Sequence, residues 1–314
     1  MRFWIVLAFL LGSFIGSLVS ANEVVWRDSS RQRSIPIKIH FPRTSATNAP
    51  VILFSHGIGS NIENCAYLAN AWAAQGFVCV LVQHPGCDDK IWKGRVRVLN
   101  EFRGAFEKNW SGRTRALDLL FVLNNLEHLA QSNPQFAERI DLENVGVGGI
   151  DLGAQAALLL AGQVPPDYGK PLHDTRIKAL LALSPPVMPM NISFREVYQP
   201  VTVPTLFMTG TKDDSIVGLT KASDRRIPFD AMTQNQRYLI ILEGGNHRMY
   251  GGRVVSLFGS RQDEMYQAAV VRGSSVFWRA ALREDPSAIR ALDHYGWESL
   301  VGVRASIERR GQAK

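Results

Sequence analysis

Short apolar runs of strand length alternate along this chain with longer segments whose apolar residues recur at helical spacing. Two nearly continuous apolar runs, Val51–Phe54 and Val78–Val82, are typical of strands that are buried on both faces of a sheet. Between them, Glu63–Gln75 has helical spacing and stops at Gly76. Such alternation is typical of βαβ units, in which helices cover both faces of a parallel sheet. The sequence therefore predicts an α/β fold with a mostly parallel central sheet.

The rest of the chain continues the same alternation. Ile35–Phe41 alternates apolar and basic residues, which predicts a half-exposed strand near an edge of the sheet. Further strands are predicted at Val145–Gly149, Ala179–Leu183, Thr205–Met208 and Tyr238–Leu242, and helices at Arg113–Leu129, Gly153–Leu160 and Gln262–Leu282. Since no long linker, repeat or compositional break follows, we expect one domain over residues 22–314, with no large cap domain.

Composition excludes several classes of protein. Hydrophobic residues make up 46% and charged residues 20% of the 314 positions, which is globular rather than disordered or collagen-like. The formal net charge is +7, but no basic run is dense enough to indicate nucleic-acid binding. The three cysteines are too few and too scattered for a disulfide scaffold or a zinc site. Cys65 and Cys87 are the pair that would form a bridge, whereas Cys79 is expected to be buried and reduced.

The first residues have the pattern of a secretory signal peptide. Arg2 precedes the apolar stretch Phe3–Leu18, and small residues at Val19 and Ala21 predict cleavage after Ala21. An uncleaved anchor or a core helix is the alternative, but the stretch is short for a membrane span of ~20 residues. We therefore expect a secreted or periplasmic protein that begins at residue 22 and has no stable membrane insertion. Loss of Arg2 lowers its formal charge from +7 to +6.

A short glycine-flanked turn joins one predicted strand to the helix that follows it. Its sequence, Gly149-Ile150-Asp151-Leu152-Gly153, has the spacing of a nucleophile elbow. The glycines would let strand and helix approach closely, while the central residue sits on a strained turn with its side chain towards a cleft. A helix C-cap or a plain βα turn would not require both glycines. The turn therefore predicts that Asp151 occupies the nucleophile position.

A second glycine turn, Ser55–Ser60, follows the predicted strand Val51–Phe54. Backbone N–H groups exposed in such a turn can complete an oxyanion hole with the N–H of Leu152. An ordinary glycine turn is the alternative. We expect His56 in this turn to be a structural hydrogen-bond donor rather than a catalytic group.

An acid and a histidine follow two later strands. Asp213 and Asp214 come after Thr205–Met208, and His247 comes after Tyr238–Leu242. Their order after Asp151 is nucleophile, acid, base. Because the carboxyl ends of parallel strands lie at one edge of a sheet, these loops should open on the same side. Asp214 is the preferred acid and Asp213 the second choice.

These segments, taken together, resemble the α/β-hydrolase fold, and within it the platelet-activating-factor acetylhydrolase, dienelactone hydrolase and polyester hydrolase-like group. The resemblance runs in order over residues 24–282 and rests on residues 28–42, Phe54-Ser-His-Gly-Ile-Gly59, His84-Pro-Gly86, Gly210-Thr-Lys-Asp-Asp-Ser215 and Gly245-Asn-His247. It implies a secreted serine ester hydrolase that acts on a small-molecule substrate without metal or organic cofactor. It also implies position 151 as nucleophile, Asp214 as acid, His247 as base, and the amides of Ile58 and Leu152 as oxyanion donors.

The chain departs from this group at the nucleophile. Where the group has G-H-S-x-G, Ile150 and Asp151 replace the histidine and the serine. An aspartate occupies this elbow in haloalkane dehalogenases and epoxide hydrolases, to which the stretch is locally similar. There a carboxylate attacks an alkyl carbon, and water cleaves the resulting ester; attack on an ester carbonyl would instead give an anhydride. Those enzymes carry a large cap, whereas only Pro185–Val203 is available here, and Leu152 is not the Trp that often follows their nucleophile.

Three hypotheses therefore stay open. The first is a hydrolase that uses Asp151, and the second is a catalytically inactive relative that acts as a binding or structural module. The third is a serine hydrolase whose nucleophile has moved to Ser55, Ser60 or Ser184. The intact acid and base favour activity, while the lost serine and missing cap favour inactivity. His247 would lie between two carboxylates, Asp151 and Asp214, which predicts a raised pKa for its imidazole in the resting protein.

Overall fold

The fold is built on one central sheet. The computed structural model describes residues 21–43, 47–89, 112–165, 169–188, 191–215, 220–234, 236–251, 261–293 and 302–311. The predicted signal peptide, up to residue 20, and most of the loop 86–110 lie outside these ranges. Among the residues described, no helix is both long and apolar enough to cross a membrane.

The sheet has nine strands in the order β1-β2-β4-β3-β5-β6-β7-β8-β9. They are β1 (Ala21–Asp28), β2 (Arg33–His40), β3 (Ala49–Ser55), β4 (Val78–Val82), β5 (Ile140–Ile150), β6 (Ile177–Leu183), β7 (Thr205–Lys212), β8 (Arg237–Asn246) and β9 (Ala305–Arg310). The six strands from β4 to β8 are parallel, and β1, β2 and β9 pair antiparallel at the two edges. The predicted α/β class with a mostly parallel sheet is confirmed.

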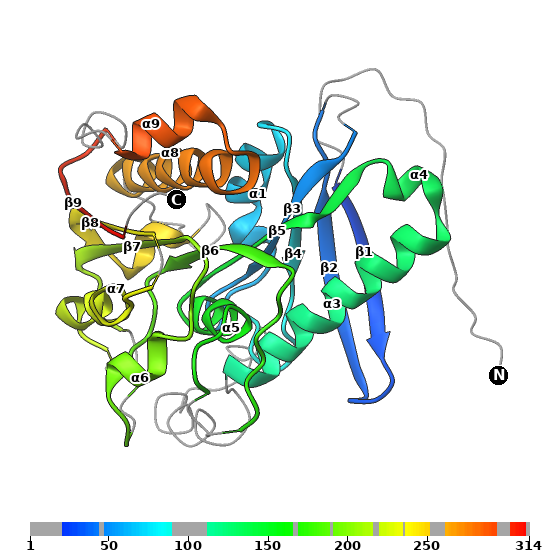
Figure 1. The fold of residues 1–314 in the computed structure, drawn as a ribbon, viewed down its shortest axis with the longest axis horizontal. Coiled ribbons are helices and arrows are strands. Elements are labelled where there is room, and N and C mark those ends of the chain that lie inside the picture. The colour runs from blue at the N-terminus through cyan, green and yellow to red at the C-terminus, as the bar shows by residue number, and fades with distance from the viewer. Residues whose placement is uncertain are drawn as a thin grey trace.

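Helices cover both faces of the sheet (Figure 1). One face packs against α3 (Gly112–Ser132), α5 (Leu152–Leu160), α6 (Phe194–Tyr198) and α7 (Ile227–Ala231), and the other against η1 (Glu63–Cys65), α1 (Ala66–Ala73), α8 (Arg261–Arg283) and α9 (Pro286–Asp293). Short helices α4 (Pro134–Ala137), η3 (Ala222–Arg226) and η4 (His247–Tyr250) complete the described elements. Each face buries its own apolar cluster, so strands in the middle of the sheet need apolar side chains in both directions.

The predicted strands and long helices all correspond to observed elements, whereas the outermost strands escaped prediction. β1 is exposed along nearly its whole length, and β9 is rich in charge, so neither has a periodic apolar pattern. Backbone pairing with β2 and β8 makes them strands. Between β6 and β7 the described residues hold only the five-residue helix α6.

All three cysteines are free and buried. The bridge considered between Cys65 and Cys87 is therefore not formed, and the expectation that Cys79 is buried and reduced is confirmed. Burial raises the pKa of the Cys65 thiol to about 12, which keeps it protonated and unreactive.

Candidate active site

The turn after β5 has the geometry of an elbow. Asp151 lies at φ 54° and ψ −120°, in a region that non-glycine residues adopt only when the surroundings impose it. A Cβ atom on Gly149 would collide with the backbone of Gly153, and one on Gly153 would collide with the carbonyl oxygen of Ser55. Both glycines are thus required by the close approach of β5, α5 and β3. The strained residue between them is the aspartate, which is 8% exposed.

The Asp151 carboxylate lies against one of the expected oxyanion donors. The backbone N–H of Ile58 donates a long hydrogen bond of 3.4 Å to Oδ2 of Asp151. Leu152 is the first residue of α5, so its N–H belongs to the helix-terminal amides that have no partner within the helix. The amino end of α5 also favours a negative charge at this point. The Ile58 amide therefore contacts the Asp151 carboxylate, and Leu152 begins the helix directly after it.

The histidine and its acid come from the ends of two neighbouring strands. His247 follows β8, and its Nδ1 lies 2.9 Å from Oδ1 of Asp213, which follows β7. The preferred acid, Asp214, was the wrong choice, because its side chain is exposed and accepts a hydrogen bond from the backbone N–H of Ala222. Of the two adjacent aspartates, only one is buried and faces His247. That residue is Asp213.

Asp213 is fully buried and is held by groups that the sequence did not reveal. Ser184 Oγ donates to Oδ1 over 3.0 Å, and Thr209 Oγ1 donates to Oδ2 over 2.9 Å. The Arg225 guanidinium, also fully buried, lies 3.3 Å from Oδ2 and donates over 2.6 Å to the Asp213 carbonyl oxygen. Arg225 therefore pairs with the buried Asp213 carboxylate and offsets its charge. A single arginine on a short helix carries no sequence pattern that would have identified it.

The pKa of His247 is raised above its ordinary value of 6.5. Burial by itself lowers this pKa, but the hydrogen bond to Asp213 and the negative charges of Asp151 and Asp213 outweigh burial, even with Arg225 opposing them. The hydrogen bond to Asp213 is the largest of the causes that raise this pKa, and the charge of Asp151 is the next. The direction agrees with the expectation of an imidazole between two carboxylates. The side chain of His247 is 18% exposed, so its ring still reaches the surface of the site.

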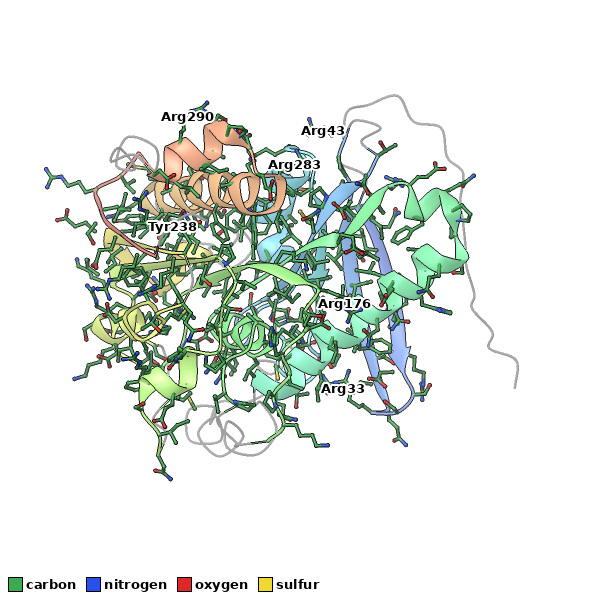
Figure 2. The ribbon with its side chains drawn as sticks, viewed as in Figure 1. Arg33, Arg43, Arg176, Tyr238, Arg283 and Arg290 are labelled. Atoms are coloured by element: carbon green, nitrogen blue, oxygen red, sulfur yellow. The ribbon has the colours of Figure 1, made fainter. Side chains whose placement is uncertain are left out.

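A second Ser-His-Asp arrangement lies beneath the site. Ser55 Oγ is 2.8 Å from Nε2 of His84, and Nδ1 of His84 is 3.0 Å from Oδ2 of Asp118. Arg31 and Arg33, from the hairpin between β1 and β2, also donate to the Asp118 carboxylate; Arg33 is marked in Figure 2 beside α3. All three residues of this arrangement are 0% exposed, so it cannot meet a substrate.

The serines considered as relocated nucleophiles are otherwise engaged. Ser55 lies in the buried arrangement with His84, and Ser184 is fully buried against Asp213 and His247. The side chain of Ser60 accepts a hydrogen bond from Asn64. Ser184 also has a positive φ of 51°, which turns its hydroxyl inward to the acid. None of the three lies at the elbow, where Asp151 stands.

Within the described parts of the chain, no three His, Cys, Asp or Glu side chains lie together in a way that could hold a metal ion. No protein-family model matches the chain, and no curated protein matches it either. The described site consists of the Asp151 carboxylate on an elbow, the Ile58 N–H beside it, and His247, which is held by the buried Asp213.

Proposed function

We propose that this chain is an exported hydrolase with the α/β-hydrolase fold, acting on a small alkyl substrate such as a halide or an epoxide, or on an ester-like analogue. Asp151 is its nucleophile, His247 its base and Asp213 its acid. The observation that carries this proposal is the placement of Asp151 at φ 54° with Oδ2 against the Ile58 N–H. One oxygen is held by the backbone, which leaves Oδ1 for attack.

In the first step, Oδ1 of Asp151 attacks the alkyl carbon, and the leaving group departs with the electron pair of the broken bond. The carboxylate becomes a neutral ester. Loss of its negative charge removes one of the causes that raise the pKa of His247, so an imidazolium can release its Nε2 proton and become a base. The proton goes to the alkoxide oxygen of an opened epoxide or, where a halide has left, to solvent.

In the second step, neutral His247 takes a proton from water at Nε2, and the hydroxide attacks Cγ of the Asp151 ester. The negative charge then develops on Oδ2, where the Ile58 N–H already points. Collapse expels the alcohol, which takes up the proton, and regenerates the carboxylate with one oxygen from water. Asp213 holds the Nδ1–H of the ring throughout.

Acyl transfer fits this arrangement less well. Attack of Asp151 on an ester carbonyl would form an anhydride, and the raised pKa of His247 favours the imidazolium, which cannot take a proton from water. The Ile58 amide that would bind an ester oxyanion is also engaged by the chain's own carboxylate. We therefore place alkyl substrates ahead of esters.

The same engaged amide favours a second candidate, a catalytically inactive relative that binds a small molecule or another protein. In that case Asp151 would serve to close the oxyanion site rather than to react. Turnover of a panel containing a haloalkane, an epoxide and an aryl ester separates the two. Halide or epoxide turnover that is lost in Asp151→Asn supports the hydrolase, while no turnover of any member supports the inactive relative.

A further inference from the structure

The peptide that joins Gly57 to Ile58 is held on both sides. A trans peptide is planar, and its C=O and N–H point in opposite directions. The N–H of Ile58 donates to Asp151, while the carbonyl oxygen of Gly57 lies 2.7 Å from Nδ1 of His56 and 3.3 Å from Nη2 of Arg115. Fixing the carbonyl therefore fixes the direction of the N–H.

Arg115 is built into the fold as an anchor for this loop. It comes from α3, is 0% exposed, and its guanidinium also donates to the carbonyl oxygens of His56 and Cys87 and to Ser55 Oγ. A buried cation has to satisfy its donors with nearby acceptors, and here two of them are backbone carbonyls of the loop Ser55–Ser60, those of His56 and Gly57. The charge of Arg115 also interacts with that of Asp151.

His56 acts on the same carbonyl in a defined tautomer. A carbonyl only accepts, so Nδ1 of His56 carries the proton, while Nε2 accepts the backbone N–H of His84 over 3.2 Å. Burial, with the charge of Arg115, lowers the pKa of His56 well below 6.5, so the ring is neutral and keeps this tautomer. The structural donor expected at this position is thus a donor to the oxyanion loop itself.

We propose that Arg115 and His56 are positioning residues that aim the Ile58 N–H at Oδ2 of Asp151. Glycine has the widest backbone freedom of any residue, and a Cβ on Gly57 would make only ordinary contacts at 3.6 Å or more, so steric packing alone does not hold this peptide. The hydrogen bonds from His56 and Arg115 to the Gly57 carbonyl oxygen hold this peptide. An effect on catalysis rests on the proposed function, whereas the direction of the Ile58 N–H can be tested in the absence of any substrate.

The test compares Arg115→Lys with the wild-type chain in an NMR titration of protein labelled with 15N-isoleucine. Lysine keeps the charge but loses the planar fork that reaches several carbonyls. In the wild type, the Ile58 amide proton should shift when acid protonates the Asp151 carboxylate, and Asp151→Asn should abolish this response. Arg115→Lys should lose the response while its other isoleucine signals stay in place.

Arg113→Lys is the matched control, because Arg113 lies on the same helix and donates instead to the carbonyl of Lys170; it should respond like the wild type. A folded Arg115→Lys protein with an unchanged Ile58 response overturns the proposal. So does a crystal structure of the wild-type chain in which Arg115 does not contact the Gly57 carbonyl, a result that decides the matter even where the variant fails to fold. If the chain turns over a substrate, Arg115→Lys should lower kcat by about 100-fold, the effect of losing one oxyanion donor, with KM little changed.

Discussion

Nδ1 of His247 lies 2.9 Å from Oδ1 of Asp213, and the same carboxylate is paired with the buried Arg225. Because a carboxylate only accepts, Nδ1 carries the proton, and Nε2 is the ring nitrogen left for chemistry. Asp151 is the other carboxylate whose charge raises the pKa of His247. A change of charge at position 151 should therefore change the pKa of the His247 imidazole.

Asp151→Asn should lower the pKa of His247. The substitution removes a negative charge that favours the imidazolium and keeps the shape of the side chain. A pH titration of the His247 ring signals by NMR measures the change. Asp214→Asn is the control, since Asp214 is exposed and bonds to the Ala222 amide, and it should leave this pKa unchanged. An equal change in both variants would contradict the assignment.

The same pairing makes a prediction about stability and pH. The folded pKa of His247 lies above 6.5, so its interactions with the carboxylates stabilise the fold fully below pH 6.5 and are lost as pH rises through the folded pKa. In Asp151→Asn this pH dependence should be smaller. Urea unfolding of both proteins across neutral and alkaline pH measures it, and equal slopes would argue against a charged His247.

Asp213→Asn should destabilise the protein strongly, by about 3–5 kcal/mol, because it leaves the buried Arg225 cation without its counter-charge. It should also abolish any turnover, since His247 loses its orienting acid. Asp214→Asn should change the free energy of unfolding by under ~0.5 kcal/mol, as exposed substitutions usually do. Urea unfolding decides between the two aspartates; a larger loss in Asp214→Asn would reverse the assignment.

The buried arrangement of Ser55, His84 and Asp118 predicts sensitivity to acid. Burial and the charge of Arg115 lower the pKa of His84 to about 4, against the effect of Asp118. Because the folded pKa of His84 lies below the ordinary 6.5, the neutral buried ring contributes its full stability above pH 6.5. That stability is lost as pH falls towards 4, since the unfolded chain then binds a proton that the folded protein does not. Its size is on the order of 3 kcal/mol, because each tenfold change in proton affinity corresponds to about 1.4 kcal/mol.

His84→Gln should therefore flatten the loss of stability between pH 6.5 and 4, measured by urea unfolding at a series of pH values. His128→Gln, on the exposed face of α3, is the control and should behave like the wild type. If His84→Gln retains the full acid sensitivity, the titration belongs to another group.

Much of this organisation was accessible from the sequence, and the reasons differ from one feature to another. The central strands are buried on both faces, so their apolar runs mark them directly, and the glycines around Asp151 follow from backbone collisions. The choice between Asp213 and Asp214 was not accessible. Two adjacent carboxylates look alike in a sequence, and only the positions of Thr209, Ser184 and Arg225 decide which of them is buried.

The residues behind the oxyanion loop were also invisible to sequence patterns. Arg115 and Asp118 lie on α3, far along the chain from Ser55–Ser60, and nothing in their spacing indicates a contact with that turn. The role of these two charged residues can be recognised only in the folded structure, where both are buried and each needs a partner. Edge strand β9 has the same difficulty, because its neighbour β8 determines its conformation.

Asp151→Ser should create or increase aryl-ester hydrolysis. A serine hydroxyl is neutral, so His247 would regain a lower pKa and could take the hydroxyl proton, while the Ile58 amide would be free to bind an ester oxyanion. The wild type should stay near background on the same ester. Ordinary enzymic hydrolysis by the wild type, unchanged in Asp151→Asn, would show that position 151 does not govern the site.

Covalent reaction of Asp151 is tested most directly by a single turnover of a haloalkane or epoxide in heavy-oxygen water, followed by mass analysis of the peptide that contains residue 151. We expect one heavy oxygen in the Asp151 carboxylate, because the hydrolytic water attacks Cγ, and no label in Asp213 or Asp214 of the same molecules. Product formation with an unlabelled Asp151, or no turnover of any substrate in the panel, would contradict a covalent role for Asp151.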